Sequence, residues 1–155
     1  MPTLILRGVH CLGIKTTTSD AVRAYVQSLL KSQHETWAAI PKLLWPKHWH
    51  GKYTRPMCLL KKALYGHPES GGHWERHLEA AINKIGGRAV EGHPSSFIFD
   101  EERILLSIYV DDLLMSGPEA AHKGLWKKLR EAGIKLDDPE PVDRCLGRSH
   151  KMFDF

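Results

Sequence analysis

Two adjacent carboxylates stand in the middle of an apolar tract. The tract covers residues 104–116, reads ILLSIYVDDLLMS, and contains Asp111 and Asp112 as its only charged residues. Two short β-favouring runs that meet at such a pair predict a tight hairpin with the carboxylates at or beside its tip. Like charges held this close in apolar surroundings repel, and a divalent cation would offset the repulsion. The chemistry indicated is metal binding, and an ordinary hairpin with an acidic turn is the alternative.

A third carboxylate, Asp20, lies at a change of pattern much earlier in the chain. Residues 16–19 are polar and include β-branched side chains, which predicts a strand leading up to Asp20. Behind it, apolar residues recur at helical spacing and predict a helix: Val22, Tyr25, Val26, Leu29 and Leu30. A carboxylate at such a junction lies near backbone N–H groups, so it suits a ligand and a helix cap equally. Taken alone, Asp20 is more simply interpreted as a cap.

A pair of histidines offers a different metal chemistry. His73 and His77 stand four residues apart on a predicted helix, as zinc-binding pairs do. The residues between them are Trp-Glu-Arg, which does not give the order of an HExxH motif, and a zinc site needs further ligands. Surface or core histidines are therefore the preferred interpretation.

Residues 42–62 combine basic charge with aromatic rings. The segment has no acidic residue, and its basic and aromatic side chains are Lys42, Lys47, Lys52, Arg55, Lys61 and Lys62 with Trp45, Trp49 and Tyr53. Such a pattern can follow a phosphate backbone and stack on bases. The alternative is a solvated loop whose Trp residues anchor it to the core. Its Pro residues and Gly51 predict a loop in either case.

The composition is that of a single globular domain. The chain has 155 residues, of which 42% are hydrophobic and 26% are charged, with a net charge of +4 and ten His. This balance weakly favours a polyanionic partner. Cys11, Cys58 and Cys145 are odd in number and far apart, as expected in a reducing compartment. No stretch has the length of a secretion signal or a membrane span, so we expect an intracellular protein, cytoplasmic or nuclear, without a membrane partner.

The remaining elements predict an α+β fold. A helix is expected up to Ile85, with its end at Gly86-Gly87, and a second one over residues 119–132, closed by Gly133. Residues 97–99 and 104–109 are expected to form a hairpin around the turn at 100–102, and residues 134–136 a further strand. Together these predict one domain, residues 1–155, in which helices pack on one face of an antiparallel sheet.

Four segments occur in the order and rough spacing of a known family. They are Asp20-Ala-Val-Arg-Ala-Tyr25, Leu64-Tyr65-Gly66 with Trp74 downstream, Tyr109-Val110-Asp111-Asp112, and Cys145-Leu146-Gly147. In this combination the chain resembles the reverse transcriptase, an RNA-directed DNA polymerase, of copia-type LTR retrotransposons. The resemblance covers about residues 20–147, and residues 1–19 match poorly.

The resemblance implies a polymerase palm that carries out two-metal nucleotidyl transfer from a dNTP to a primer 3′-hydroxyl. Asp20, Asp111 and Asp112 would be the catalytic carboxylates that hold Mg²⁺, or Mn²⁺ in its place. The family pattern assigns the incoming nucleotide to Ala24, Tyr25, Tyr65 and Gly66. It assigns primer and template contacts to Tyr109, Val110, Leu146 and Gly147.

The chain also departs from the family pattern. Ser19 and Ala21 flank Asp20 in place of hydrophobic residues, and residues 67–71 read His-Pro-Glu-Ser-Gly where the family commonly has Gln and Ala-Pro. An acid at Glu69 is unfavourable beside a triphosphate. The fingers and thumb are largely missing, so we expect a polyprotein fragment with little activity alone, whose integrase and RNase H segments are partners. The alternative is a catalytically inactive retroelement remnant that at most binds nucleic acid.

Overall fold

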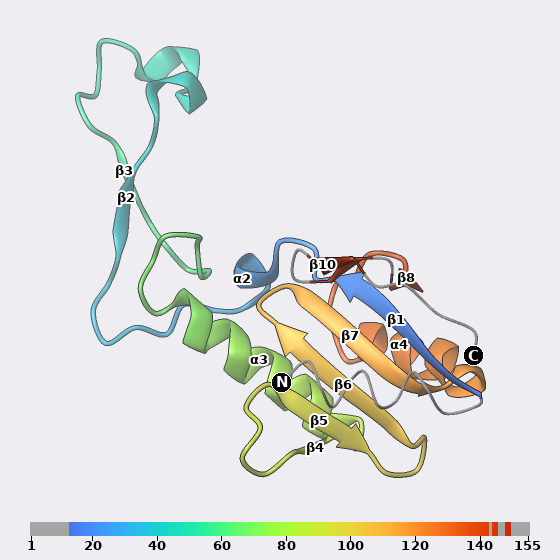
Figure 1. Cartoon of the computed structure of the whole chain (residues 1–155). Helices are drawn as coiled ribbons and strands as arrows, with labels where there is room; N and C mark the ends of the chain where they lie inside the picture. The colour runs from blue at the N-terminus through green and yellow to red at the C-terminus, as the bar shows by residue number, and fades with distance from the viewer. Residues whose placement is uncertain (1–12, 143, 146–147, 150–155) are drawn as a thin grey trace. The chain divides into compact units, whose positions relative to one another are not determined.

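The computed structural model describes residues 13–142, 144–145 and 148–149, and the chain divides into two compact units (Figure 1). The first unit consists of Met1–Ala24 and Glu75–Phe155, and the second is Tyr25–Trp74. The first unit contains the three carboxylates, and the second contains the basic and aromatic segment.

A six-stranded antiparallel sheet forms the first unit. Its strands are β1 (Ile14–Asp20), β4 (Arg88–Ala89), β5 (Ser96–Phe99), β6 (Ile104–Tyr109), β7 (Asp112–Pro118) and β8 (Glu140–Pro141). The spatial order is β4-β5-β6-β7-β1-β8 (Figure 1). Strand β1 is therefore placed between β7 and β8, beside a hairpin that lies much later in the sequence. Two short strands, β9 (Arg144–Cys145) and β10 (Arg148–Ser149), pair separately.

Helix α4 (Glu119–Glu131) packs on the face of the sheet to which Thr17 points. The indole N–H of Trp126 donates to Thr17 Oγ1 at 3.0 Å, and Thr17 Oγ1 lies 2.9 Å from His122 Nδ1. His122 Nε2 lies 3.2 Å from the carbonyl oxygen of Gly117, which can only accept. Nε2 therefore carries a proton, and because burial lowers the pKa of His122, the imidazole is neutral and its Nδ1 accepts a hydrogen bond from the Thr17 hydroxyl.

Helix α3 (Ser70–Lys84) covers the same face farther along the sheet. Side chains alternate along strands, so the register places Phe97 and Phe99 on the face of Leu106, Met115 and Thr17. A Cβ added at Gly87 would lie 2.4 Å from Ile82 of α3 and 2.8 Å from Phe99. Both side chains close over Gly87, which shows that α3 packs against β5. The core lies between these two helices and this face of the sheet.

The opposite face of the sheet is more polar. It presents Thr16, Thr18 and Asp20 from β1 and Leu114, Ser116 and Asp112 from β7. The hydroxyls of Thr16 and Ser116 are hydrogen bonded across the strands at 2.9 Å. This row of polar side chains ends at the two carboxylates.

The second unit is built on a two-stranded hairpin. Strands β2 (Trp37–Ala39) and β3 (Met57–Leu59) pair antiparallel, and two 3₁₀ turns, η1 (Lys42–Leu44) and η2 (Lys47–Trp49), lie between them. Backbone bonds extend the ladder at both ends, from Ile40 N–H to Pro56 O and from Leu60 N–H to Thr36 O, each at 2.9 Å. Strand β3 lies inside residues 42–62, so the prediction of a loop is wrong for residues 57–59. They pair with residues 37–39, which are distant in the chain, and such pairing leaves no local signal in the sequence.

Most predicted elements are confirmed. The hairpin at the acidic pair, the helix ending near Gly86, the helix closed by Gly133 and the strand leading to Asp20 are all present. The described part of the chain contains no helix long and apolar enough to cross a membrane.

The helix expected after Asp20 is wrong. The structure has only a one-turn helix, α2 (Ala24–Gln27), and Leu29 instead forms an isolated bridge with Lys62 and is 53% exposed. Ala21 bridges to Leu136, so the sheet continues past Asp20, and Arg23 has a left-handed φ of +52° that no α-helix accommodates. The interpretation of Asp20 as a helix cap is also wrong, because Asp20 ends β1 and α2 begins only at Ala24. The strand expected over residues 134–136 is reduced to that one bridge.

Candidate active site

The acidic hairpin has a two-residue turn. Tyr109 and Asp112 are the last paired residues of β6 and β7, and Val110 and Asp111 connect them. Val110 has a φ of +59°, whereas Asp111 is not among the residues with positive φ. A turn in which only the first of the two central residues has a positive φ matches type II′. Gly is the usual residue at that first position.

Val110 is therefore strained. A β-branched residue in the left-handed region is a rare conformation that costs about 1–3 kcal/mol and persists only where the surrounding structure imposes it. The flanking ladder does so here, with register pairs from Leu105↔Ser116 to Tyr109↔Asp112. Strain of this kind is concentrated at functional sites, which directs attention to the two residues that follow Val110.

Asp20 lies directly opposite Asp112. The two residues are register partners in the β1–β7 ladder. The backbone N–H of Ala21 donates to Asp111 O at 2.8 Å, which makes Asp20 and Asp112 a non-hydrogen-bonded pair. In such pairs the side chains point to the same face and approach most closely. Two carboxylates from distant parts of the sequence thus share one place at the end of the sheet.

The electrostatics of Asp112 reflect this proximity. Its pKa is raised above the ordinary range, first by partial burial, and then by the negative charges of Asp20 and Asp111 and a hydrogen bond with the Asp20 side chain. A carboxyl that is hard to ionise beside two others becomes easier to ionise when a cation is present. The arrangement is electrostatically prepared for positive charge.

The backbone around Asp20 is held on its other side as well. Asp137 N–H donates to Asp20 O at 2.9 Å, and Ser19 Oγ donates to Asp137 O at 2.7 Å. Val22 N–H donates to Lys135 O at 2.9 Å. These bonds fix the end of β1 between β7 and the segment that leads to β8.

The donor set suits a hard cation such as Mg²⁺. Carboxylate oxygens are its preferred protein ligands, and it is commonly held by one or two carboxylates together with waters and substrate phosphates. Asp20 and Asp112 supply two such groups on one face, with Asp111 adjacent. Within residues 13–142 and the two short described pairs beyond, no three His, Cys, Asp or Glu side chains form a complete ligand group. A cation held by Asp20 and Asp112 would need solvent or substrate oxygens as its further ligands.

The aromatic residues assigned to the nucleotide come together in the second unit. The rings of Tyr25 and Tyr65 are 4.5 Å apart between centroids and tilted by 40°. Tyr65 and Gly66 form the centre of a turn closed by a bond from His67 N–H to Leu64 O at 3.1 Å. Gly66 has a φ of +88°, as the third residue of a type II turn requires. Ala24, in contrast, is fully buried.

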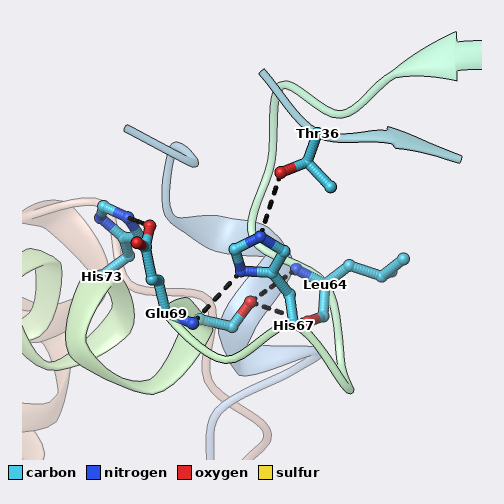
Figure 2. A network of polar contacts seen from close by, with 6 residues as sticks. Thr36, Leu64, His67, Glu69 and His73 are labelled. Carbon is cyan, nitrogen blue, oxygen red and sulfur yellow. Dashed lines mark hydrogen bonds and ion pairs between the residues drawn. The ribbon is translucent and has the colours of Figure 1, made fainter. Parts of the chain in front are cut away.

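A polar network holds this turn, as Figure 2 shows. His67 Nδ1 accepts from the backbone N–H of Glu69 at 3.2 Å, so its Nε2 carries the proton that faces Thr36 Oγ1 at 3.1 Å. Ser70 Oγ donates to Leu64 O at 2.7 Å and accepts from Leu64 N–H at 3.0 Å. The sequence analysis did not identify these supporting roles. The Ser at the start of a helix and the His-Pro before it were the available signals.

Glu69 and His73 belong to the same network. Glu69 Oε2 lies 3.6 Å from His73 Nε2, and the pKa of Glu69 is lowered, chiefly by the nearby Ser32 side chain and also by His73. The acid that departs from the family pattern is thus engaged within its own loop. His73 is buried, and in the described part of the chain no metal-ligand group forms around His73 and His77. The zinc interpretation gains no support.

The residues assigned to primer and template are partly described. Tyr109 is 62% exposed and Val110 is 40% exposed at the hairpin tip, so both are accessible. Leu146 and Gly147 lie outside the described residues. No protein-family model matches the chain.

Proposed function

We propose that this chain carries the palm-type core of an RNA-directed DNA polymerase, with Asp20, Asp111 and Asp112 as its metal-binding carboxylates. The observation that supports this best is the register pair Asp20↔Asp112 at the end of the sheet, beside the strained turn of Tyr109-Val110-Asp111-Asp112. The resemblance had linked these segments by order and spacing alone. Their juxtaposition is what a two-carboxylate metal site requires.

The arrangement of the layers is compatible with a nucleic acid substrate. Helices α3 and α4 cover one face of the sheet, so that face is occupied by the core. Asp20 and Asp112 lie at the end of the other face, where Asp20 is exposed and Asp112 is half-buried. A palm needs its carboxylates on the face away from its helices, because the primer end must reach them.

Each carboxylate has a distinct part in this proposal. Asp20 and Asp112 would hold the cation between two neighbouring strands, and Asp111, in the turn, would contribute from the hairpin tip. When bound, Mg²⁺ would activate the primer 3′-hydroxyl and neutralise the triphosphate and leaving pyrophosphate. Because burial and the neighbouring carboxylates raise the pKa of Asp112, cation binding would favour its ionised form and would weaken as the pH falls.

Within the second unit, the residues to which the resemblance assigns the nucleotide are the Tyr25 and Tyr65 rings and the turn at Gly66. The paired rings offer an apolar surface to a sugar or base, with Tyr65 52% exposed. In the described part of the chain nothing lies within 4 Å of the point where Gly66 would carry a Cβ, so the backbone there allows close approach. The network around His67 keeps this turn in place.

Primer extension tests the proposal. The purified chain would be supplied with a DNA primer on an RNA template, dNTPs and either Mg²⁺ or Mn²⁺. We expect metal-dependent incorporation that Asp111→Asn abolishes. Asp100→Asn is the matched control, because Asp100 is an exposed carboxylate in the turn between β5 and β6, where it pairs with Arg88.

Two results would count against polymerase activity. Incorporation that is unchanged by Asp111→Asn would show that the carboxylates are not the catalytic groups. If neither metal supports incorporation while the carboxylates still bind the cation, the chain is an inactive remnant of such an enzyme.

A further inference from the structure

The second unit carries a surface that the proposed polymerase site does not use. We call residues 37–59 the arm; they comprise β2, β3 and the two 3₁₀ turns between them. Between Glu35 and Glu69 the sequence contains no acidic residue. The basic residues of this stretch are Lys42, Lys47, Lys52, Arg55, Lys61 and Lys62, and all of them are exposed.

The aromatic rings of the arm have two different tasks. Trp45 is half-buried, and its indole N–H donates to Ile40 O at 2.7 Å, so this ring fastens the loop to the strand. Trp49 is also half-buried and meets Tyr53 edge-on at 5.7 Å between centroids. Tyr53 itself is 46% exposed. The sequence suggested that the Trp residues anchor this segment to the core, but the bond of Trp45 lies within the arm itself, and the Tyr53 ring is left partly exposed.

Lysines lie over two of these rings. Lys52 Nζ is 5.6 Å from the centroid of the Tyr53 ring, and Lys42 Nζ is 6.0 Å from that of Trp45. Both distances are within the range of a cation–π contact. At Tyr53 the lysine thus lies over one face of a ring that is still 46% exposed, so positive charge and ring surface are presented together.

We propose that the arm binds single-stranded nucleic acid. This binding does not involve the carboxylate site and does not depend on polymerase activity. A single strand offers phosphates to Lys and Arg, and base faces to an exposed ring, at the spacing of successive nucleotides. In a duplex the base faces are stacked on one another, so they are not accessible to an aromatic side chain, whereas the phosphates still are. The pairing of Lys52 with Tyr53 thus favours single strands, and the absence of any acid allows the strand to pass along the whole arm.

A lipid surface fits the arm less well. Leu43 is 94% exposed and Leu44 is 69% exposed, and such side chains could enter a bilayer. However, η1 is only three residues long, so the apolar surface does not extend into the amphipathic helix face by which interfacial helices bind membranes. The charge of the arm is spread well beyond these two leucines.

Fluorescence anisotropy of labelled oligonucleotides tests the proposal. The full chain would be titrated onto a 5′-labelled oligouridylate or oligothymidylate of about 20 nucleotides, which exceeds the footprint of a small domain. EDTA would be present, so that the carboxylate site cannot contribute. We expect binding tighter than to a duplex of the same length, with log K falling linearly with log salt at about −0.7 per phosphate neutralised.

Two variants separate charge from stacking. Lys52→Gln should make the salt slope shallower by about 0.7, because one phosphate contact is lost. Tyr53→Leu should weaken binding by about tenfold with little change of slope, because stacking is lost and charge is not. Lys123→Gln, an exposed lysine on α4 in the first unit, is the matched control and should change neither. Circular dichroism of each variant would verify folding.

The proposal would be overturned by equal affinity for duplex and single strand, or by arm variants that bind as well as Lys123→Gln. It would also be overturned if the chain ignored oligonucleotides but bound vesicles of phosphatidylserine and phosphatidylcholine, with loss on changing Leu43 and Leu44 to Ser. Asp111→Asn should bind oligonucleotides normally. If primer extension fails but single-strand binding is intact, only the proposed polymerase function is refuted. If primer extension succeeds but the arm does not bind single strands, only the inference about the arm is refuted.

Discussion

Replacing Asp112 by Asn should stabilise the metal-free protein, although the proposed function needs this residue. Asp112 lies opposite Asp20 in a non-hydrogen-bonded pair, and its pKa is raised by burial and by the charges of Asp20 and Asp111. Ionising Asp112 in the folded state therefore costs more free energy than ionising it in the unfolded chain. Asparagine retains the shape and removes the charge.

The expected gain is modest. Like charges directly opposite on neighbouring strands destabilise a sheet by up to about 1 kcal/mol, and partial solvent exposure of the pair keeps the effect near this scale. For a domain of this size, about 1 kcal/mol corresponds to about 2–4 °C in the thermal midpoint. Asp112→Asn should therefore melt about 2–4 °C higher than the wild type at pH 7 in EDTA.

The pH dependence follows from the direction of the pKa shift. Because the folded state binds the Asp112 proton more tightly than the unfolded state, the free energy of unfolding falls as pH rises from the ordinary range of an Asp through the raised folded pKa. At pH values below both, the carboxyl is protonated in each state and the difference between variant and wild type should vanish. With Mg²⁺ the order should invert, since bound cation stabilises the wild type by mass action and the variant less.

Thermal melting followed by circular dichroism, at several pH values and with EDTA or Mg²⁺, measures all three effects. Glu91→Gln, an exposed carboxylate between β4 and β5, serves as the control for the loss of one negative charge. A variant that melts below the wild type in EDTA would refute the argument that the pair is repulsive. A stabilisation that persists unchanged at acid pH would refute its electrostatic origin.

Two further predictions concern the packing of the sheet. Gly117→Ala should lower the free energy of unfolding by about 1–3 kcal/mol in urea titrations, because the new methyl group overpacks the site. The added Cβ would lie 2.7 Å from Ile104 Cγ1 and 2.9 Å from the backbone oxygen of Arg103; Gly124→Ala on α4, where nothing lies within 4 Å, should not destabilise the fold. The second prediction is that the wild type should lose stability relative to His122→Gln as pH falls below about 6.5, since burial lowers the pKa of His122 and the unfolded chain takes up the proton first. Parallel pH-dependent melts of the two proteins that run at a constant separation would contradict this assignment.

The sequence predicted those elements whose signals are local. Alternation and β-favouring residues around Asp111 predicted the β6–β7 hairpin, and helical spacing with a closing Gly133 predicted α4. The segment after Asp20 also had helical spacing, yet it does not form a long helix, because the bridge of Ala21 to Leu136 and the left-handed Arg23 prevail. Such pairing between residues far apart in the chain overrides local helix propensity, and it produces no periodic pattern in the sequence from which it could be predicted.

The candidate site was predictable to a similar extent. Asp111 and Asp112 could be identified from their apolar surroundings, whereas Asp20 alone suggested a helix cap. Its partnership with Asp112 depends on the register of two distant strands, and only the family resemblance linked them in advance. The supporting bonds of His67 and Ser70 depend on the fold of a loop and were missed.

Because Asp20 is paired with Asp112, the site depends on the register between β1 and β7. Successive residues of a strand point to opposite faces, so shifting β1 by one position against β7 would move the Asp20 side chain to the face covered by helices. A shift by two would restore the face but carry the carboxylate past its partner. Loss or gain of a single residue in β1 would thus separate the two carboxylates, although every motif would still be present in the sequence. Intact motifs alone therefore do not guarantee an intact site.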